Sequence, residues 1–158
     1  MSDLKELEEL LVNAEVEKAL ELISKIDDKK AAAEFLNDFA ASLMAQIGDY
    51  PNAYLLLKKA LELNPEIPEA YYNLGLLLSE PEVLRVNSKN LDDAIANYKK
   101  AITLNPKLAR AYYNLGLIYA YTGKKKEAME NYNSAVKNDP KNRERYDNIL
   151  YILKKKRL

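Results

Sequence analysis

The sequence predicts an all-α protein built from consecutive antiparallel helix pairs, and three observations carry this prediction. Two stretches nearly repeat each other, at 65–78 and 106–119. Apolar residues recur at helical spacing within and after each stretch. An Asn-Pro or Asp-Pro pair closes each unit, at 64–65, 105–106 and 139–140. Proline ends a helix because it lacks an N–H and pushes the preceding residue out of the α region.

The repeated unit has a period of about 34 residues, a length typical of helix-pair repeats. Gly75 and Gly116 align the two similar stretches. The second helices then align as well, with Ala94, Tyr98, Ala101 and Pro106 matched to Ala128, Tyr132, Ala135 and Pro140. When the whole repeat frame is carried back by 34 residues from Gly75, the later landmarks of the earlier unit are Gly48, Ala53, Leu57, Ala60 and Pro65. The spacing therefore predicts repeats at 34–67, 68–108 and 109–142.

Small residues let the two helices of a pair approach, and bulky residues fill the space that remains. In the repeat 109–142 the expected close contact joins Gly116 and Ala128. The expected filler residues are Tyr112, Leu115, Tyr119 and Tyr132. Gly48 and Gly123 mark turns within pairs, because glycine adopts the left-handed conformation at a helix end at least cost.

The first residues of the chain predict a weaker unit at 1–33. Leu7 and Leu10 form an apolar face for a first helix, and Ala19 and Ile23 fall at second-helix positions. We therefore expect about four helix pairs in a single domain that spans residues 1–158.

The last residues predict a capping helix at 143–157. Its apolar residues recur at helical spacing and are Tyr146, Ile149, Leu150 and Leu153. The rest of the segment is largely basic, and a polar outer face is what the end of a helical stack requires.

The segment Tyr112-x-x-Leu-Gly-x-x-Tyr119 resembles the signature of the tetratricopeptide repeat (TPR) family, with tyrosine where tryptophan is commonest. The later landmarks of that signature match Gly123, Ala128, Tyr132, Ala135 and Pro140. Repeat 68–108 keeps the pattern, with Leu78 in place of the second tyrosine and seven additional residues between its helices. Repeat 34–67 departs from the first-helix signature, with Asn37, Ala40, Ala41 and Met44 at its sites. The resemblance implies a right-handed superhelical solenoid of TPR-like helix pairs.

Composition narrows the classes of function. Lysine plus arginine and aspartate plus glutamate number 24 each, so no overall field favours nucleic acid or an anionic membrane. The chain has no cysteine and no histidine, which removes thiolate nucleophiles, imidazole bases and nearly every zinc site. No apolar run approaches the length of a membrane span, and the first residues lack the features of a secretory signal. We therefore expect a cytoplasmic protein that is not an enzyme, holds no metal or cofactor, and binds neither nucleic acid nor membrane.

The resemblance implies that the first helix of each pair lines a concave groove that binds other proteins. The main candidates for ligand contact are Tyr72, Asn73, Leu76, Arg110, Tyr113, Asn114, Leu117 and Tyr121. Further groove-facing positions are Phe35, Asp38, Phe39, Ser42 and Glu69. Tyrosines offer large contact area at low entropic cost, and asparagine carboxamides both donate to and accept from a peptide backbone.

The equivalent residues Asn73 and Asn114 have two interpretations of equal weight: contacts to a ligand, or residues shared with the family average without a ligand. For Tyr112, Tyr119 and Tyr132 the core interpretation is strongly favoured, because their spacing places them between helices. One TPR subfamily grips the carboxyl terminus of chaperones with lysine, asparagine and arginine. Asn114 stands where that arginine belongs, so this kind of capture is not expected.

The insertion 79–90 places Val83, Leu84 and Val86 in a connection that should be polar. These residues either cover a neighbouring edge, which is favoured, or contact a partner. The basic runs at 124–126 and 154–157 are interpreted as solvated helix ends rather than as nucleic-acid contacts.

The leading functional hypothesis is a scaffold or adaptor that binds a peptide or helix in the concave groove. The alternative is an engineered or structural repeat protein with no natural ligand. Absence of cysteine, histidine and tryptophan favours this alternative, whereas the degenerate first repeats and the irregular insertion argue against it.

Overall fold

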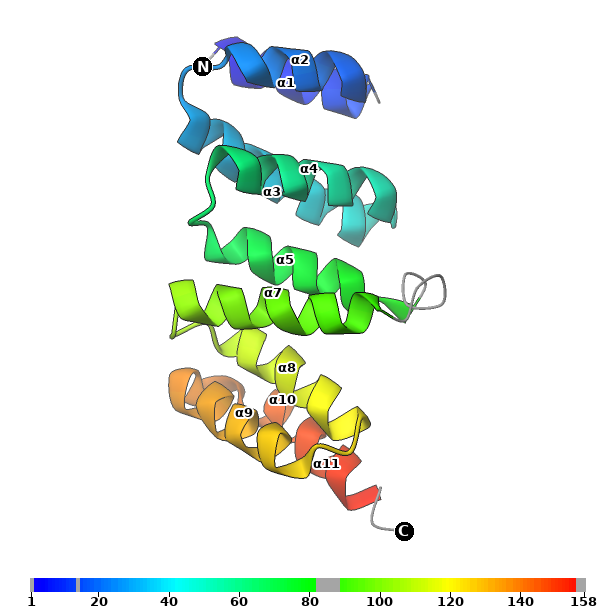
Figure 1. Ribbon diagram of the computed structural model, residues 1–158, viewed down its shortest axis with the longest axis vertical. Helices are drawn as coiled ribbons and strands as arrows, with labels where there is room; N and C mark the ends of the chain where they lie inside the picture. Colours follow the sequence, from blue (N-terminus) through cyan, green and yellow to red (C-terminus); the bar gives the residue numbers. More distant parts are fainter. Residues whose placement is uncertain (1, 14, 82–88, 156–158) are drawn as a thin grey trace. The chain divides into compact units, whose positions relative to one another are not determined.

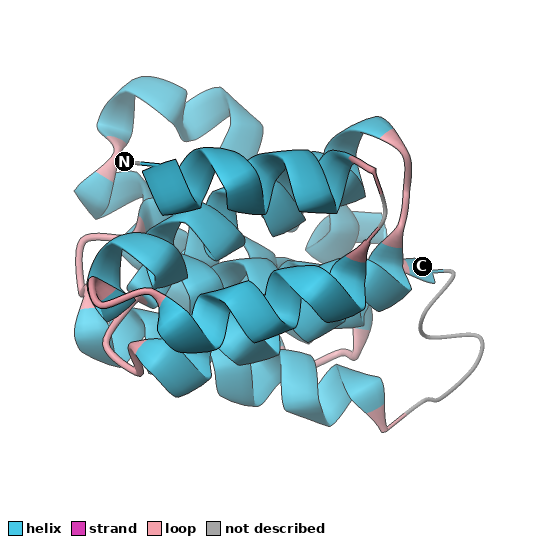
Figure 2. Ribbon diagram, turned by 90° about the horizontal axis from the view of Figure 1, so that it is seen from above, coloured by secondary structure: helices cyan, strands magenta, loops and turns pink. Residues whose placement is uncertain are grey.

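The computed structural model describes residues 2–13, 15–81 and 89–155. Within these residues the secondary structure is helical and contains no strand (Figure 2). The α-helices are α1 (Ser2–Val12), α2 (Val16–Lys25), α3 (Lys29–Gln46), α4 (Tyr50–Leu63), α5 (Pro68–Ser79), α7 (Asn90–Leu104), α8 (Ala109–Tyr121), α9 (Lys125–Asn138), α10 (Arg143–Tyr146) and α11 (Asn148–Lys155). Short loops join α1 to α2, α3 to α4 and α8 to α9 as helix pairs, which confirms the predicted all-α, TPR-like class (Figure 1).

The chain divides into two compact units, Met1–Asn73 and Leu74–Leu158, which we call the N-terminal and C-terminal units. The N-terminal unit holds the pairs α1–α2 and α3–α4 and the first residues of α5 (Figure 1). The weak repeat at its start is a real helix pair, because Leu7, Ala19 and Ile23 are fully buried. Helix α3 begins at Lys29, five residues before the predicted repeat boundary at 34.

Two aspartates begin the helices of the second pair. The Asp28 carboxylate accepts a hydrogen bond from the Ala31 N–H at 2.9 Å, at the start of α3. At the start of α4 the Asp49 carboxylate accepts one from the Asn52 N–H at 3.2 Å. Each bond satisfies a backbone donor that the first helical turn leaves without a partner. Gly48 turns the chain between the two helices with a φ of 65°, as its position predicted.

The C-terminal unit is packed around glycines and tyrosines. A Cβ built on Gly75 would lie 2.9 Å from ring carbons of Tyr98, which is fully buried. A Cβ built on Gly116 would lie 3.5 Å from the Ala128 carbonyl oxygen and 2.6 Å from the Ile149 terminal methyl. The predicted approach of the two helices at Gly116 and Ala128 is therefore confirmed, and α11 also packs on this glycine.

Helix ends in this unit follow the proline rule. Helices α7 and α9 end at Leu104 and Asn138, directly before the Asn-Pro and Asp-Pro pairs. Gly123 has a φ of 79° in the turn between α8 and α9. Residues 82–88 of the insertion, including Val83, Leu84 and Val86, lie outside the described residues, so the two roles proposed for them stay predictions.

The C-terminal cap comprises two short helices instead of the one helix predicted at 143–157. A 3-10 turn, Pro140–Asn142, precedes α10. The Tyr132 hydroxyl donates to Asp147 Oδ1 at 2.6 Å, and the Tyr146 hydroxyl donates to Asp139 Oδ2 at 2.7 Å. Burial, with the hydrogen bond to Asp139, raises the pKa of Tyr146 to about 12. These two bonds tie α10 and the start of α11 to helix α9.

Candidate functional site

Helix α8 of the C-terminal unit carries five of the eight main candidate contact residues. Arg110, Asn114, Leu117 and Tyr121 follow one another at steps of four, three and four residues. Such steps place side chains on one face of an α-helix. Arg110 and Tyr121 are exposed, whereas Asn114 and Leu117 are half-buried. We call these four residues the α8 face.

The α8 face changes character along the helix. A guanidinium lies near the first turn, a carboxamide in the middle, and an aliphatic and an aromatic side chain near the last turn. Tyr121 leaves 61% of its surface exposed, a large value for an aromatic residue. A peptide that pairs a carboxylate with apolar side chains would match this order of groups.

Tyr113, on the neighbouring part of α8, is covered by the cap. Its ring centroid lies 5.3 Å from that of Tyr146, at an interplanar angle of 49°. The Arg145 guanidinium carbon lies 5.5 Å from the same ring centroid, within the range of a cation–π contact. Tyr113 is 8% exposed and therefore contributes to packing more than to an open surface.

Sequence reasoning missed Arg145 and Tyr146 as neighbours of this candidate residue. Tyr146 had been identified only as part of the apolar face of the cap. The sequence did contain a signal for this contact. A capping helix must cover part of the first helix of the last repeat, and Tyr113 is a large residue of that helix next to the signature residue Tyr112.

In the N-terminal unit Asn73 takes part in a short chain of hydrogen bonds. Its Nδ2 donates to Asn37 Oδ1 at 2.9 Å, and Asn37 Nδ2 donates to Asp38 Oδ1 at 3.1 Å. Asn37 is only 5% exposed, so its carboxamide needs these partners. Asn73 thus joins α5 to α3, which favours the structural interpretation for this asparagine.

The candidates Tyr72 and Leu76, one position before and three positions after Asn73, are also largely enclosed. Tyr72 is buried, and Leu76 in the C-terminal unit is half-buried. Among the eight main candidates, Arg110 and Tyr121 are exposed, and among the further groove-facing positions Asp38 and Ser42 are exposed.

Other kinds of site were sought in the same residues. Across 2–13, 15–81 and 89–155, no group of three or more acidic side chains is arranged to hold a metal ion. No helix in the described part of the chain is both long and apolar enough to cross a bilayer.

This architecture defines a class of protein, the helical-repeat proteins. Comparison with family models identifies the family within it. A model described as TPR repeat matches residues 42–80 and 85–123, and a model described as tetratricopeptide repeat matches residues 109–142. The chain belongs to the tetratricopeptide repeat family, as the signature predicted.

Solved structures show the same fold. A crystal structure of MamA is 25% identical, with a TM-score of 0.59, and the match covers 94% of this chain and 91% of that one. MamA from Desulfovibrio magneticus RS-1 is 24% identical, with a TM-score of 0.59 and coverage of 98% and 89%. A chain of the CopN-Scc3 complex is 20% identical, with a TM-score of 0.58 and coverage of 76% and 68%. No match was found among curated protein sequences. Membership of the TPR family supports a protein-interaction scaffold, and the solved structures show the fold.

Proposed function

We propose that this protein is an interaction scaffold that binds an extended peptide or a helix of a partner protein along its first helices. The observation that carries the proposal is the α8 face, with its exposed Arg110 and Tyr121 at opposite ends of one helix. Tyrosine and arginine are the residue types that most often dominate the binding energy of protein interfaces.

The α8 face also suggests the kind of segment that binds. Arg110 and Arg145, which lies over Tyr113, place two cations beside the first half of α8. Leu117 and Tyr121 make the second half apolar. We expect a partner segment with a carboxylate followed by apolar side chains, and Asn114 is positioned to bind its backbone.

Tyr72, Asn73 and Leu76 belong to the proposal through their equivalence to Tyr113, Asn114 and Leu117 in sequence. The hydrogen bond between Asn73 and Asn37 gives Asn73 a structural partner, so its replacement would affect stability as well as binding. Asn114 and Tyr121 belong to the α8 face itself, so their replacement tests that face directly.

The test is to select short displayed peptides on the intact chain and to measure their affinity for variants. Asn114→Ala with Tyr121→Ala should weaken binding at least tenfold, which corresponds to about 1.4 kcal/mol. Arg110→Gln should weaken binding most for peptides that carry a carboxylate.

The matched control is Asn133→Ala with Tyr151→Ala. It removes one exposed asparagine and one exposed tyrosine from α9 and α11. Circular dichroism should show that all variants keep their helices. Equal loss of affinity in the control, or unchanged affinity in Asn114→Ala with Tyr121→Ala, would remove the α8 face from the binding surface.

A further inference from the structure

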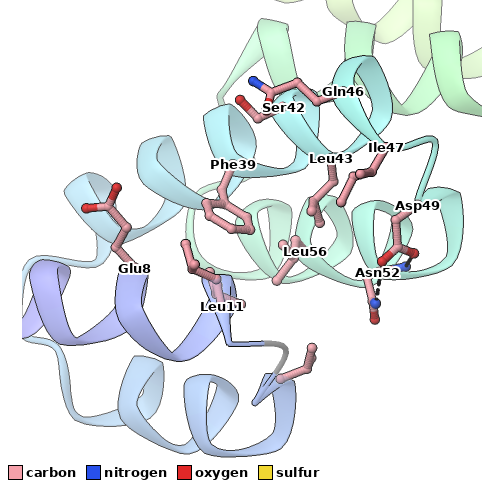
Figure 3. A pocket seen from close by; sticks show the side chains of 12 residues that line it. Glu8, Leu11, Phe39, Ser42, Leu43, Gln46, Ile47, Asp49, Asn52 and Leu56 are labelled. Carbon is pink, nitrogen blue, oxygen red and sulfur yellow. Dashed lines mark hydrogen bonds between the residues drawn. The ribbon is translucent and has the colours of Figure 1, made fainter.

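The N-terminal unit contains a pocket of about 420 Å³, whose lining includes Phe39 and Ser42, two of the groove-facing positions that the sequence indicated. It lies between the pairs α1–α2 and α3–α4, close to the turn at Gly48 (Figure 3). Leu11 of α1, Phe39 and Leu43 of α3 and Leu56 of α4 point toward the same space. Binding pockets for other molecules commonly have volumes of about 300 to 1,000 Å³ and apolar linings of this type.

The pocket has a closed apolar floor and an exposed apolar rim. Leu56 is fully buried and Leu11 is buried, whereas Leu43 is half-buried. At the rim, Val12 is 68% exposed and Ile47 is 70% exposed. Apolar surface that continues from a pocket onto its rim is typical of interaction sites and costs free energy while it stays in water.

The wall of the pocket is held in place. Phe39 stacks on Phe35, with ring centroids 6.1 Å apart. Asp49 accepts hydrogen bonds from the Asn52 N–H at 3.2 Å and the Asn52 Nδ2 at 2.7 Å. Side chains fixed in this way lose little freedom when a ligand binds.

The charged groups of the lining are all acidic. Glu8 lies on one side of the apolar floor, and Asp49 lies on the opposite side (Figure 3). None of the described residues that line the pocket is a lysine or an arginine. A ligand that suits it has an apolar centre with positive charge on either side.

We propose that this pocket binds a partner protein through one bulky apolar side chain flanked by lysine or arginine residues. A peptide segment fits better than a small apolar molecule, because a segment can fill the floor, cover Val12 and Ile47, and place cations near both Glu8 and Asp49. The site belongs to the N-terminal unit and does not rest on the α8 face.

The experiment uses short displayed peptides that are random except for a central leucine or phenylalanine, selected on the intact chain. The selected peptides should carry lysine or arginine on both sides of the centre. Methyl resonances of Val12, Leu43 and Ile47 should shift when such a peptide is added. Selection of peptides without basic flanks, or shifts confined to other residues, would overturn the proposal.

Charge variants test the acidic ends. Glu8→Gln with Asp49→Asn should weaken the basic peptides about three- to tenfold and reduce the salt dependence of binding, as expected for two rim charges. Asparagine also caps helices well, so Asp49→Asn keeps the start of α4. The control, Glu9→Gln with Glu17→Gln, makes the same change in charge at exposed residues outside the pocket and should leave affinity unchanged.

A second pair of variants tests the apolar rim without disturbing the core. Ile47→Ser should weaken binding several-fold, whereas Leu55→Ser, at an exposed leucine of α4 outside the pocket, should not. Asn114→Ala with Tyr121→Ala should bind these peptides normally, which separates this site from the α8 face. Equal effects of Ile47→Ser and Leu55→Ser, or binding of a small apolar compound such as benzene where the peptides fail, would contradict the proposal.

Discussion

The pairs α3–α4 and α8–α9 follow the same plan but are filled by different side chains. Helix α8 buries Tyr113, Leu115, Gly116, Ile118 and Tyr119, among others. Helix α3 buries Ala32, Ala33, Leu36, Asn37 and Ala40. Where the family signature is present, large residues close the packing around a glycine. Helix α3 buries mainly small residues instead, and other residues of α3, Phe39, Ser42, Leu43 and Gln46, line the pocket.

The largest effect that would test this comparison is expected from Tyr98→Ala. Tyr98 is fully buried against Gly75, and its hydroxyl lies 3.1 Å from Ser79 Oγ. Its removal leaves a cavity and should lower the free energy of unfolding by about 3–5 kcal/mol. Urea unfolding followed by circular dichroism gives this value.

Leu56→Ala provides the matching measurement in the N-terminal unit. Leu56 is also fully buried, but it lies at the floor of a pocket, into which neighbouring side chains can shift when its own is shortened. Its replacement should cost about 2 kcal/mol, the lower end for a buried leucine. A cost equal to that of Tyr98→Ala would show that the N-terminal unit is packed as well around Leu56 as the C-terminal unit is around Tyr98 of α7.

The next effect comes from the glycine of the signature. A Cβ at Gly75 meets the rigid ring of Tyr98, so Gly75→Ala should destabilise the protein by about 1–2 kcal/mol, after about 1 kcal/mol of improved helix propensity. At Gly116 the nearest atom is the terminal methyl of Ile149, which can move, and the cost should be smaller. The equivalent residue of α3 is Ala41, and Ala41→Gly should cost about 1 kcal/mol. Stabilisation by Gly75→Ala would refute the close approach.

The sequence predicted most of the fold because its landmarks act locally. Proline and glycine set the ends of α4, α7 and α9, and the turns at Gly48 and Gly123 have the backbone conformation that glycine favours. The repeat boundary was placed at 34, whereas α3 begins at Lys29, directly after the cap residue Asp28. The boundary at 34 was set by the repeat period, and the period does not determine where an individual helix begins.

The candidate sites were harder to predict, because they depend on contacts between residues far apart in the chain. Periodicity placed the α8 face on one side of a helix, but it did not show that the cap covers Tyr113. The hydrogen bond between Asn73 and Asn37 joins residues 36 positions apart. The pocket results from side chains that fail to fill space, which no spacing rule detects.

Helix caps provide a third and smaller test. The N-cap residues of α3 and α4 are aspartates that bond to the backbone, whereas the N-caps of α8 and α9, Leu108 and Lys124, have no side-chain cap bond. Asp28→Ala should lower stability by about 1 kcal/mol. Lys124→Asp should raise stability by less than that, because it also removes the contact of Lys124 with the Tyr119 ring. The reverse order of effects, measured by urea unfolding, would mean that the Asp28 bond does not stabilise α3.

The smallest expected effect on stability comes from Tyr146 in the cap of the C-terminal unit, and it depends on pH. Folding raises the pKa of Tyr146 from its usual 10 to about 12, because the hydroxyl is buried and donates to Asp139. The neutral hydroxyl is therefore favoured by the folded state. Its contribution to stability is complete below pH 10 and is lost as the pH rises from 10 to about 12.

Tyr146→Phe should be slightly less stable than the native protein below pH 10, and the difference should shrink between pH 10 and 12. Lysines and the other tyrosines titrate in both proteins, so the difference between the two unfolding curves isolates Tyr146. The pKa of a second tyrosine, Tyr132, is also raised, mainly by its hydrogen bond to Asp147. The same measurement on Tyr132→Phe therefore separates the contribution of Tyr132 from that of Tyr146. At acid pH the difference should shrink as well, because hydrogen bonds from Asn142 and Tyr146 lower the pKa of Asp139, and protonation weakens its role as an acceptor. A difference that stays constant across the alkaline range would mean that the Tyr146 hydroxyl does not hold the cap to α9.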